Sequence, residues 1–176
     1  MDVQEAIQVR KSVRSYDSKQ VPDDALGRVL EAGRISPSAS NLQPWHFIVV
    51  KDPERRKALS GGRYAKFLAE SPVVIIGCGN TKASPKWYPI DVSIALQQMV
   101  IVATAEGLGT CWIGSFSEEE VRKAANIPQD YSVVAMLTLG YPKDKTDLSV
   151  KIDRSKSRKP LEKIVSYEVF GGPKRD

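Results

Sequence analysis

The stretch Pro72–Cys78, with the sequence Pro-Val-Val-Ile-Ile-Gly-Cys, is a continuous apolar run rich in Val and Ile. A strand with one face in water alternates apolar and polar residues, whereas an unbroken apolar run is typical of a strand buried on both faces. We therefore expect this segment to form the centre of a sheet. The other segments that predict strands lie at 46–51, 110–113 and 132–139.

Helical patterns separate these strands along the chain. A helix ending near Ile35 is predicted by apolar residues at the spacing of one helix face, namely Leu26, Val29, Leu30 and Gly33. The segment 91–106 is apolar on most sides, which indicates a buried helix, and Gly107-Leu108-Gly109 ends it. Shorter helices are expected over 2–9, from the N-cap Asp52 to Gly61, over 63–70, and from the N-cap Ser117 to Asn126.

Length and composition favour one ordinary globular domain over residues 1–176. The chain is 41% hydrophobic and 27% charged, as soluble proteins are, and no run approaches the roughly 18 apolar residues of a membrane span. Its first residues lack the basic and apolar regions of a secretory signal. We therefore expect a cytoplasmic protein that does not enter a membrane.

Metal and nucleic-acid binding find little support in the sequence. The chain has one histidine, His46, and its two cysteines, Cys78 and Cys111, have apolar neighbours that predict buried thiols without a disulfide. A formal charge of +5 suits anionic ligands. However, the basic residues are dispersed and carry no interleaved aromatic platform, so a nucleic-acid partner is not expected.

Two short basic clusters, Arg10–Arg14 and Lys156–Pro160, each contain a serine. On a helix, Arg10 and Arg14 would share one face with the Ser12 hydroxyl nearby, and paired N–H donors of this kind suit a phosphate dianion. A chain with 26 Lys and Arg residues also produces such clusters by chance, so solvated surface is the favoured interpretation of each cluster taken alone.

Four motifs in order are more specific than either cluster alone. They are Arg10-x-Ser12-x-Arg14, then Pro37-Ser-Ala-Ser-Asn41-Leu-Gln43-Pro44-Trp45, then Gly107-Leu108-Gly109 leading to Cys111-Trp112-Ile113-Gly114, and finally Lys156-x-Arg158. With this order and spacing the chain resembles the FMN-dependent nitroreductase family over nearly its whole length. The resemblance implies an α+β fold with a mixed, mainly antiparallel sheet of four or five strands, flanking helices, and termini that wrap a partner subunit.

The resemblance also implies a site for the FMN phosphate and ring. The phosphate would be held by residues of the first and last motifs, Arg10, Ser12, Arg14, Lys156 and Arg158, with Lys11 left in solvent. The loop residues Pro37, Ser38, Ala39 and Ser40 would reach the ring from the partner subunit, which implies a homodimer with FMN at the interface. Trp45 is expected to anchor this loop against the core.

Some site residues keep two interpretations. Asn41 could bond the flavin or only its own loop, and the former is favoured. Lys66 stands where relatives place a cation near the pyrimidine edge of the ring, but it could equally be a solvated lysine, and Arg63 could serve the same pocket. Gly114 and Ser115 lie in the segment that passes flavin N5. Many relatives carry an acidic residue there, so Gly114 puts the orientation of substrates in doubt.

By this resemblance the protein is an oxidoreductase whose chemistry belongs to FMN, so no catalytic side chain is expected. NAD(P)H would deliver hydride and leave before a nitroaromatic, quinone or similar electron-poor acceptor takes the electrons, which is a ping-pong cycle. The alternative is a flavin-binding carrier or redox sensor without turnover, which the departure at Gly114 favours.

Overall fold

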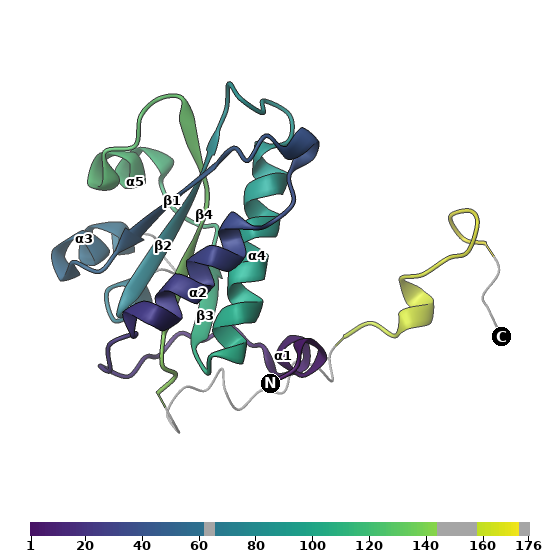
Figure 1. Cartoon of the computed structure of the whole chain (residues 1–176), viewed down its shortest axis with the longest axis horizontal. Helices are drawn as coiled ribbons and strands as arrows, with labels where there is room; N and C mark the ends of the chain where they lie inside the picture. The colour runs from purple at the N-terminus through teal and green to yellow at the C-terminus, as the bar shows by residue number, and fades with distance from the viewer. Residues whose placement is uncertain (62–65, 144–157, 173–176) are drawn as a thin grey trace.

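The computed structural model describes residues 1–61, 66–143 and 158–172. Four strands form one sheet, in the order β1 (Trp45–Val50), β2 (Val73–Asn80), β4 (Tyr131–Gly140) and β3 (Gly109–Ile113). Every neighbouring pair is antiparallel, with Val74 opposite Val50 on one side and opposite Thr138 on the other. The predicted α+β class and the four predicted strands are confirmed (Figure 1).

The segment 72–78 is central, as its sequence predicts. Within β2 the residues from Val73 to Gly79 are buried, because helices cover both faces of the sheet. On one face lie α2 (Asp23–Arg34) and α4 (Tyr88–Ala105), and their apolar side chains pack on Val73 and Ile75. On the other face α3 (Pro53–Ala58) and α5 (Glu118–Ala125) lie over a second cluster around Val74 and Ile76 (Figure 1).

Helix α4 is the main core helix. It has 18 residues and begins three positions before the predicted start, at Tyr88. By length and composition alone it could cross a membrane, but Val92, Leu96, Met99 and Val100 are fully buried against α2 and the sheet. Its outer face is less buried than the sequence predicts, because Ile90 and Ile94 are exposed.

The predicted helix starts are confirmed by hydrogen bonds. The Asp52 carboxylate accepts the Arg55 N–H at 2.9 Å, and the Ser117 hydroxyl accepts the Glu120 N–H at 3.3 Å. A 3₁₀ turn, η2 (Leu59–Gly61), extends α3 to the predicted end. Of the short helix expected over 63–70, the described part contains only the 3₁₀ turn η3 (Lys66–Leu68), and Arg63 lies outside the described residues.

The first basic cluster is not helical, contrary to prediction. Helix α1 (Val3–Val9) ends before it, and Arg10 has the non-helical angles φ −55° and ψ 127°. The helix cannot continue because the next residues attach to the sheet: the Val13 N–H donates to the Thr110 carbonyl at 2.8 Å, and Val13 is 1% exposed. A buried apolar residue and an available strand edge thus outweigh local helix propensity.

The C-terminal tail extends away from the body (Figure 1). A 3₁₀ turn, η5 (Leu161–Lys163), gives it local structure, and Leu161, Ile164 and Val169 expose their apolar side chains. The sequence-based expectation that the tail packs on a partner chain stays a prediction.

The end of α4 follows from its two glycines. The Leu108 N–H donates to Ala103 O at 2.8 Å and the Gly107 N–H to Thr104 O at 3.0 Å, which is the Schellman pattern. This pattern requires a left-handed residue, and Gly107 has φ +74°. The turn sends the chain directly from α4 into β3.

We expect Gly107→Ala to lower the free energy of unfolding by about 1 kcal/mol, because alanine is strained at this φ. Gly27→Ala is the matched control. Gly27 lies within α2, and a Cβ there meets nothing within 4 Å. Alanine should raise stability at that position by roughly 0.5–1 kcal/mol. Urea unfolding followed by circular dichroism measures both changes. If both substitutions changed the free energy of unfolding in the same direction, this account of the turn would be contradicted.

Candidate functional site

The basic cluster lies along the first residues of β3. Ser12 forms a parallel β-bridge with Thr110, so the chain is extended there. Alternate residues of an extended chain point to the same side, and this period brings Arg10, Ser12 and Arg14 together. The three residues therefore lie close together, although they do not lie on the predicted helix. Arg10 and Ser12 are partly buried and Arg14 is exposed.

Gly109 permits this attachment. A Cβ added to Gly109 would lie 2.7 Å from Val13 Cγ2 and 2.9 Å from Val13 Cβ, which is closer than packed atoms approach. The second glycine of Gly107-Leu108-Gly109 is thus needed so that the segment carrying Ser12 can approach β3. The first glycine forms the turn, and Leu108 is buried in the core.

Cys111 marks the point on which the three polar residues converge. Burial raises the pKa of its thiol, while the charge of Arg14, hydrogen bonding with Ser12 and Arg14, and the charge of Arg10 act in the opposite direction. Burial likewise raises the pKa of the Cys78 thiol to about 11. Both cysteines are free and buried, as predicted. Protonated, buried thiols are poor nucleophiles, so we assign no covalent chemistry to Cys111. Its surroundings carry the positive charge of Arg10 and Arg14.

Tyr16 holds the cluster against β4, and no sequence pattern predicts this role. Its hydroxyl donates to Val13 O at 2.7 Å and lies 2.5 Å from Thr138 Oγ1 in the central strand β4. The Asp17 N–H donates to Tyr141 O at 2.9 Å just beyond β4. Such contacts join residues that are more than 100 positions apart, and no local pattern announces them.

The loop between α2 and β1 is an ordered element. It contains the 3₁₀ turn η1 (Ala39–Asn41), and Ser40, Asn41 and Gln43 have φ of 50°, 55° and 47°. The Ser38 hydroxyl accepts the Gln43 N–H at 2.9 Å, and the Gln43 side-chain amide donates to Asn41 Oδ1 at 3.1 Å. The Asn41 side chain therefore bonds its own loop in this structure, and a contact with flavin stays a prediction.

Trp45 follows the loop and packs on the core beside Phe47, with ring centroids 6.4 Å apart. The Asn80 N–H also holds the end of the loop, by donating to Pro44 O at 2.8 Å. Among the loop residues expected at the ring, Pro37 and Ser40 are exposed, and Ser38 and Ala39 are partly buried.

Asp91 joins the loop to α4. This carboxylate lies in the first turn of α4, and its Oδ1 accepts the Ala39 N–H at 3.1 Å. The residue is 2% exposed, and its Oδ2 has no hydrogen-bond partner among the described residues. An acidic residue within an otherwise apolar helix was the available sequence signal, but the pattern does not reveal the bond to Ala39.

The end of β3 is open. Gly114 and Ser115 follow the strand and are exposed, and a Cβ added to Gly114 would meet nothing within 4 Å. At 3.3 Å per residue, Gly114 lies about 13 Å along the strand from Thr110. A polar, positive region at the start of β3 is thus joined by one strand to open space at its end.

Three further cations are predicted at the site, Lys66, Lys156 and Arg158. Lys66 begins η3, and the segment after η3 is held by Arg56, whose guanidinium donates to Ala69 O at 2.8 Å and to Ser71 O. Arg158 is exposed in the tail, and Lys156 lies outside the described residues. Their roles at the site stay predictions.

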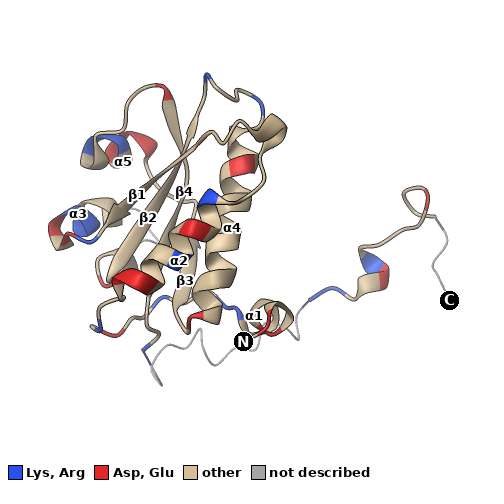
Figure 2. Cartoon of the chain, in the orientation of Figure 1, with Lys and Arg blue, Asp and Glu red and all other residues tan. Residues whose placement is uncertain are grey.

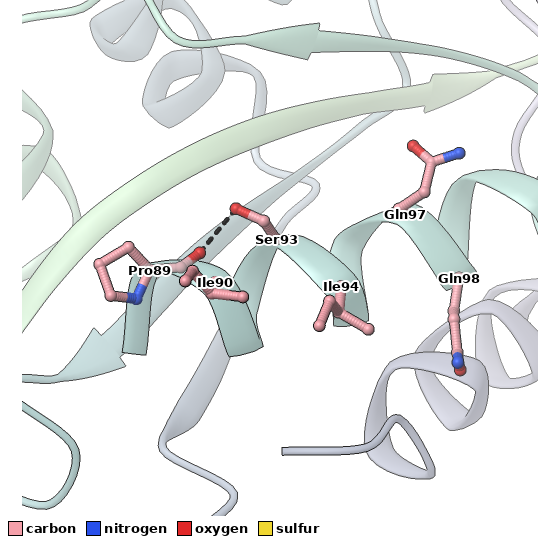
Figure 3. A pocket seen from close by; sticks show the side chains of 6 residues that line it. All are labelled: Pro89, Ile90, Ser93, Ile94, Gln97 and Gln98. Atoms are coloured by element: carbon pink, nitrogen blue, oxygen red, sulfur yellow. Dashed lines mark hydrogen bonds between the residues drawn. The ribbon is translucent and has the colours of Figure 1, made fainter. Parts of the chain in front are cut away.

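A groove of about 570 Å³ runs along the outer face of α4, lined by Pro89, Ile90, Ser93, Ile94, Gln97 and Gln98 (Figure 3). Ile90 is 50% exposed and Ile94 is 38% exposed. Two glutamines of α4 connect the groove with its surroundings, because Gln97 accepts from Trp112 Nε1 at 3.3 Å and Gln98 from the Ser36 hydroxyl at 2.8 Å.

Other ligand classes have less support in the described parts of the chain. No group of three or more His, Cys, Asp or Glu residues there could hold a metal ion. Figure 2 shows acidic residues beside basic ones on α2, α3 and α5. The positive charge is therefore divided among many places, and a broad basic surface for nucleic acid is not formed by these helices.

Known proteins share this fold and sequence pattern. The model of the nitroreductase family matches residues 7–61 and 59–141. A protein of Archaeoglobus fulgidus with the provisional name NADH dehydrogenase/NAD(P)H nitroreductase is 35% identical over 156 residues, covering 84% of this chain and 90% of that protein. A solved nitroreductase family protein from Clostridium difficile is 30% identical with a TM-score of 0.85, over 97% of this chain and 100% of that one. An FMN-dependent nitroreductase from Clostridium difficile is 27% identical with a TM-score of 0.76, over 93% and 99%.

These matches confirm the family predicted from the four motifs. The family model spans more than half of the chain, and the Archaeoglobus relative is similar over most of its own length. The chain therefore belongs to the nitroreductase family of oxidoreductases.

Proposed function

We propose that the protein is an FMN-dependent oxidoreductase that passes electrons from NAD(P)H to a nitroaromatic, quinone or similar electron-poor acceptor by a ping-pong cycle. The observation that carries this proposal is the arrangement along β3: Arg10, Ser12 and Arg14 meet at its start, and open space surrounds Gly114 at its end. The names of the relatives support the redox partners, since one is called an NAD(P)H nitroreductase and another is FMN-dependent.

The residues present fit FMN. Two arginines and a hydroxyl suit a phosphate dianion, because charge-assisted hydrogen bonds to phosphate oxygens are short and strong. The roughly 13 Å of strand between Thr110 and Gly114 suits a ligand with a phosphate at one end and a planar group at the other. The chemistry that bound FMN would supply is to accept hydride and pass the electrons to the second substrate.

The chain's own residues would bind the cofactor and leave space for the substrates. Arg10, Ser12 and Arg14 hold the phosphate, and the missing side chain at Gly114 leaves room above the strand for one planar substrate after another. Gly114 offers no charge to orient the acceptor, so shape and stacking select it. This favours several electron-poor aromatic acceptors over one specific substrate. Lys66, Lys156 and Arg158 would add positive charge from segments beyond the strand.

We further infer a homodimer whose two sites are each built from both chains. Asp91 holds the loop at the first turn of α4, whereas the basic cluster lies beside Thr110, just after the other end of this helix (Figure 1). At 1.5 Å per residue these ends are about 20 Å apart. A second copy that packs its α4 antiparallel in the groove would bring its loop beside the first copy's open strand end, and it would cover Ile90 and Ile94.

The test of function is a spectrum followed by rapid mixing. The purified protein with added FMN should show a bound-flavin spectrum, and NADH or NADPH should bleach it under anaerobic conditions. An electron-poor quinone should then restore the colour. Absence of bound flavin would contradict the proposal. Bound flavin that neither donor bleaches would instead support the carrier or redox sensor.

Replacing Arg10 and Arg158 together by Ala should weaken FMN binding at least about tenfold, because each removes a charge-assisted bond to phosphate. Lys11→Ala is the matched control, since Lys11 is exposed between Arg10 and Ser12 and should change binding little. Fluorescence titration of FMN measures both. Equal losses in the two variants would mean that the phosphate site is misassigned.

Ile94→Glu should convert the dimer to a monomer and weaken FMN binding, because a buried unpaired carboxylate at the groove would be costly. Lys123→Glu introduces the same side chain on α5, on the opposite face of the sheet, and should leave both properties unchanged. Light scattering after gel filtration gives the mass. A monomeric wild type that binds FMN normally would contradict the two-chain site.

A further inference from the structure

The loop from Ser38 to Gln43 has an unfavourable backbone. Three of its residues, Ser40, Asn41 and Gln43, have left-handed φ although none is glycine. Side chains with a Cβ are strained in this region, and such conformations persist only where the surroundings fix them. The bonds from Ser38 and Gln43 described above close the loop on itself. They do not fix it relative to the rest of the fold.

The bond from Ala39 to Asp91 gives this external attachment at the loop's centre. Ala39 begins the 3₁₀ turn η1, and its N–H donates to Asp91 Oδ1 at 3.1 Å. The Ser38 side chain does not cap this turn, because its hydroxyl accepts the Gln43 N–H. Asp91 therefore caps the turn from another element of the fold.

Burial of this carboxylate lowers the stability of the fold, which indicates that Asp91 has a role other than core packing. Asp91 is 2% exposed and makes a single hydrogen bond through Oδ1, while Oδ2 has none among the described residues. A buried carboxylate with an unmet oxygen lowers stability, and the N-terminal end of α4 offsets this only in part. An apolar residue would suit this position better if core packing were its only role.

We propose that Asp91 is a positioning residue: its buried carboxylate locks the strained loop in the shape that presents Ser38, Ala39, Ser40 and Asn41 to the flavin. The part of this proposal that concerns flavin rests on the proposed function. The attachment itself does not, because it acts in the protein without cofactor. Asp91 thus sets the geometry of the site without being required to touch the cofactor.

The experiment compares Asp91→Ala and Asp91→Asn in the full-length protein. Hydrogen exchange of the Ala39 and Gln43 amides is measured by NMR without FMN, and FMN affinity is measured separately by fluorescence titration. Asp91→Ala should speed exchange at both amides and weaken FMN binding about tenfold, the usual effect of losing a bond to a charged acceptor. Asp91→Asn keeps a carbonyl oxygen for Ala39 and should restore part of both properties, because a neutral acceptor is weaker.

Two controls separate positioning from general destabilisation. Ser84→Ala removes the other buried polar group that has no partner among the described residues. This hydroxyl lies just before α4, and its loss should change neither property. Val100→Ala creates a core defect farther along the same helix, so it should lower thermal stability without speeding exchange in the loop.

Three outcomes would overturn the proposal. The loop amides of Asp91→Ala could exchange at the wild-type rate, those of Val100→Ala could exchange as fast as those of Asp91→Ala, or Asp91→Asn could recover neither slow exchange nor FMN affinity. If wild type binds no FMN, the proposed function fails, while the exchange data still decide whether Asp91 locks the loop. If wild type binds FMN and Asp91→Ala binds it equally well, the function stands and the positioning role fails.

Discussion

The hydrogen bond from the Val13 amide to the Thr110 carbonyl is the contact on which the arrangement of the site depends. It converts a stretch with no regular structure of its own into an extended segment along β3, and this extension aligns Arg10, Ser12 and Arg14. The bond requires close approach of two backbones, which only the missing side chain of Gly109 allows. Tyr16 then holds the segment to β4. Sheet geometry thus brings these polar groups together, and the arginines do not form the backbone arrangement that holds them. This arrangement suits the proposed phosphate site.

The parts of the fold that the sequence predicted well are those governed by burial. The apolar run 72–78 has only one stable place, between two other strands and beneath helices on both sides, and α4 is similarly constrained. The helix interpretation of Arg10–Arg14 failed because a spacing of four residues satisfies both a helical and an extended period. Val13, which is apolar between polar neighbours and buried against β3, was the residue that distinguished the two.

Site residues that act through other residues were harder to predict. Arg10, Ser12 and Ser38 belong to a recognisable motif, whereas Tyr16, Arg56 and Asp91 act through hydrogen bonds to other parts of the fold. A tyrosine, an arginine on a short helix and an acid in an apolar helix are each common. Their roles follow only from which carbonyl or amide the fold brings within 3 Å, and single-sequence patterns contain no information about that.

The proposed function links cofactor binding with dimer formation through the two ends of α4. The loop and the basic cluster belong to the same proposed site but lie at opposite ends of one helix, so a single chain cannot bring its own loop to its own basic cluster without breaking the bond to Asp91. If the site is completed by a second copy, any ligand that bridges the two chains must favour the dimer, and the dimer must bind that ligand more tightly. Exposed apolar groups on α4 then have a functional reason. In the proposed dimer these groups would lie between the two copies, so that the proposed site would be complete only where two copies meet.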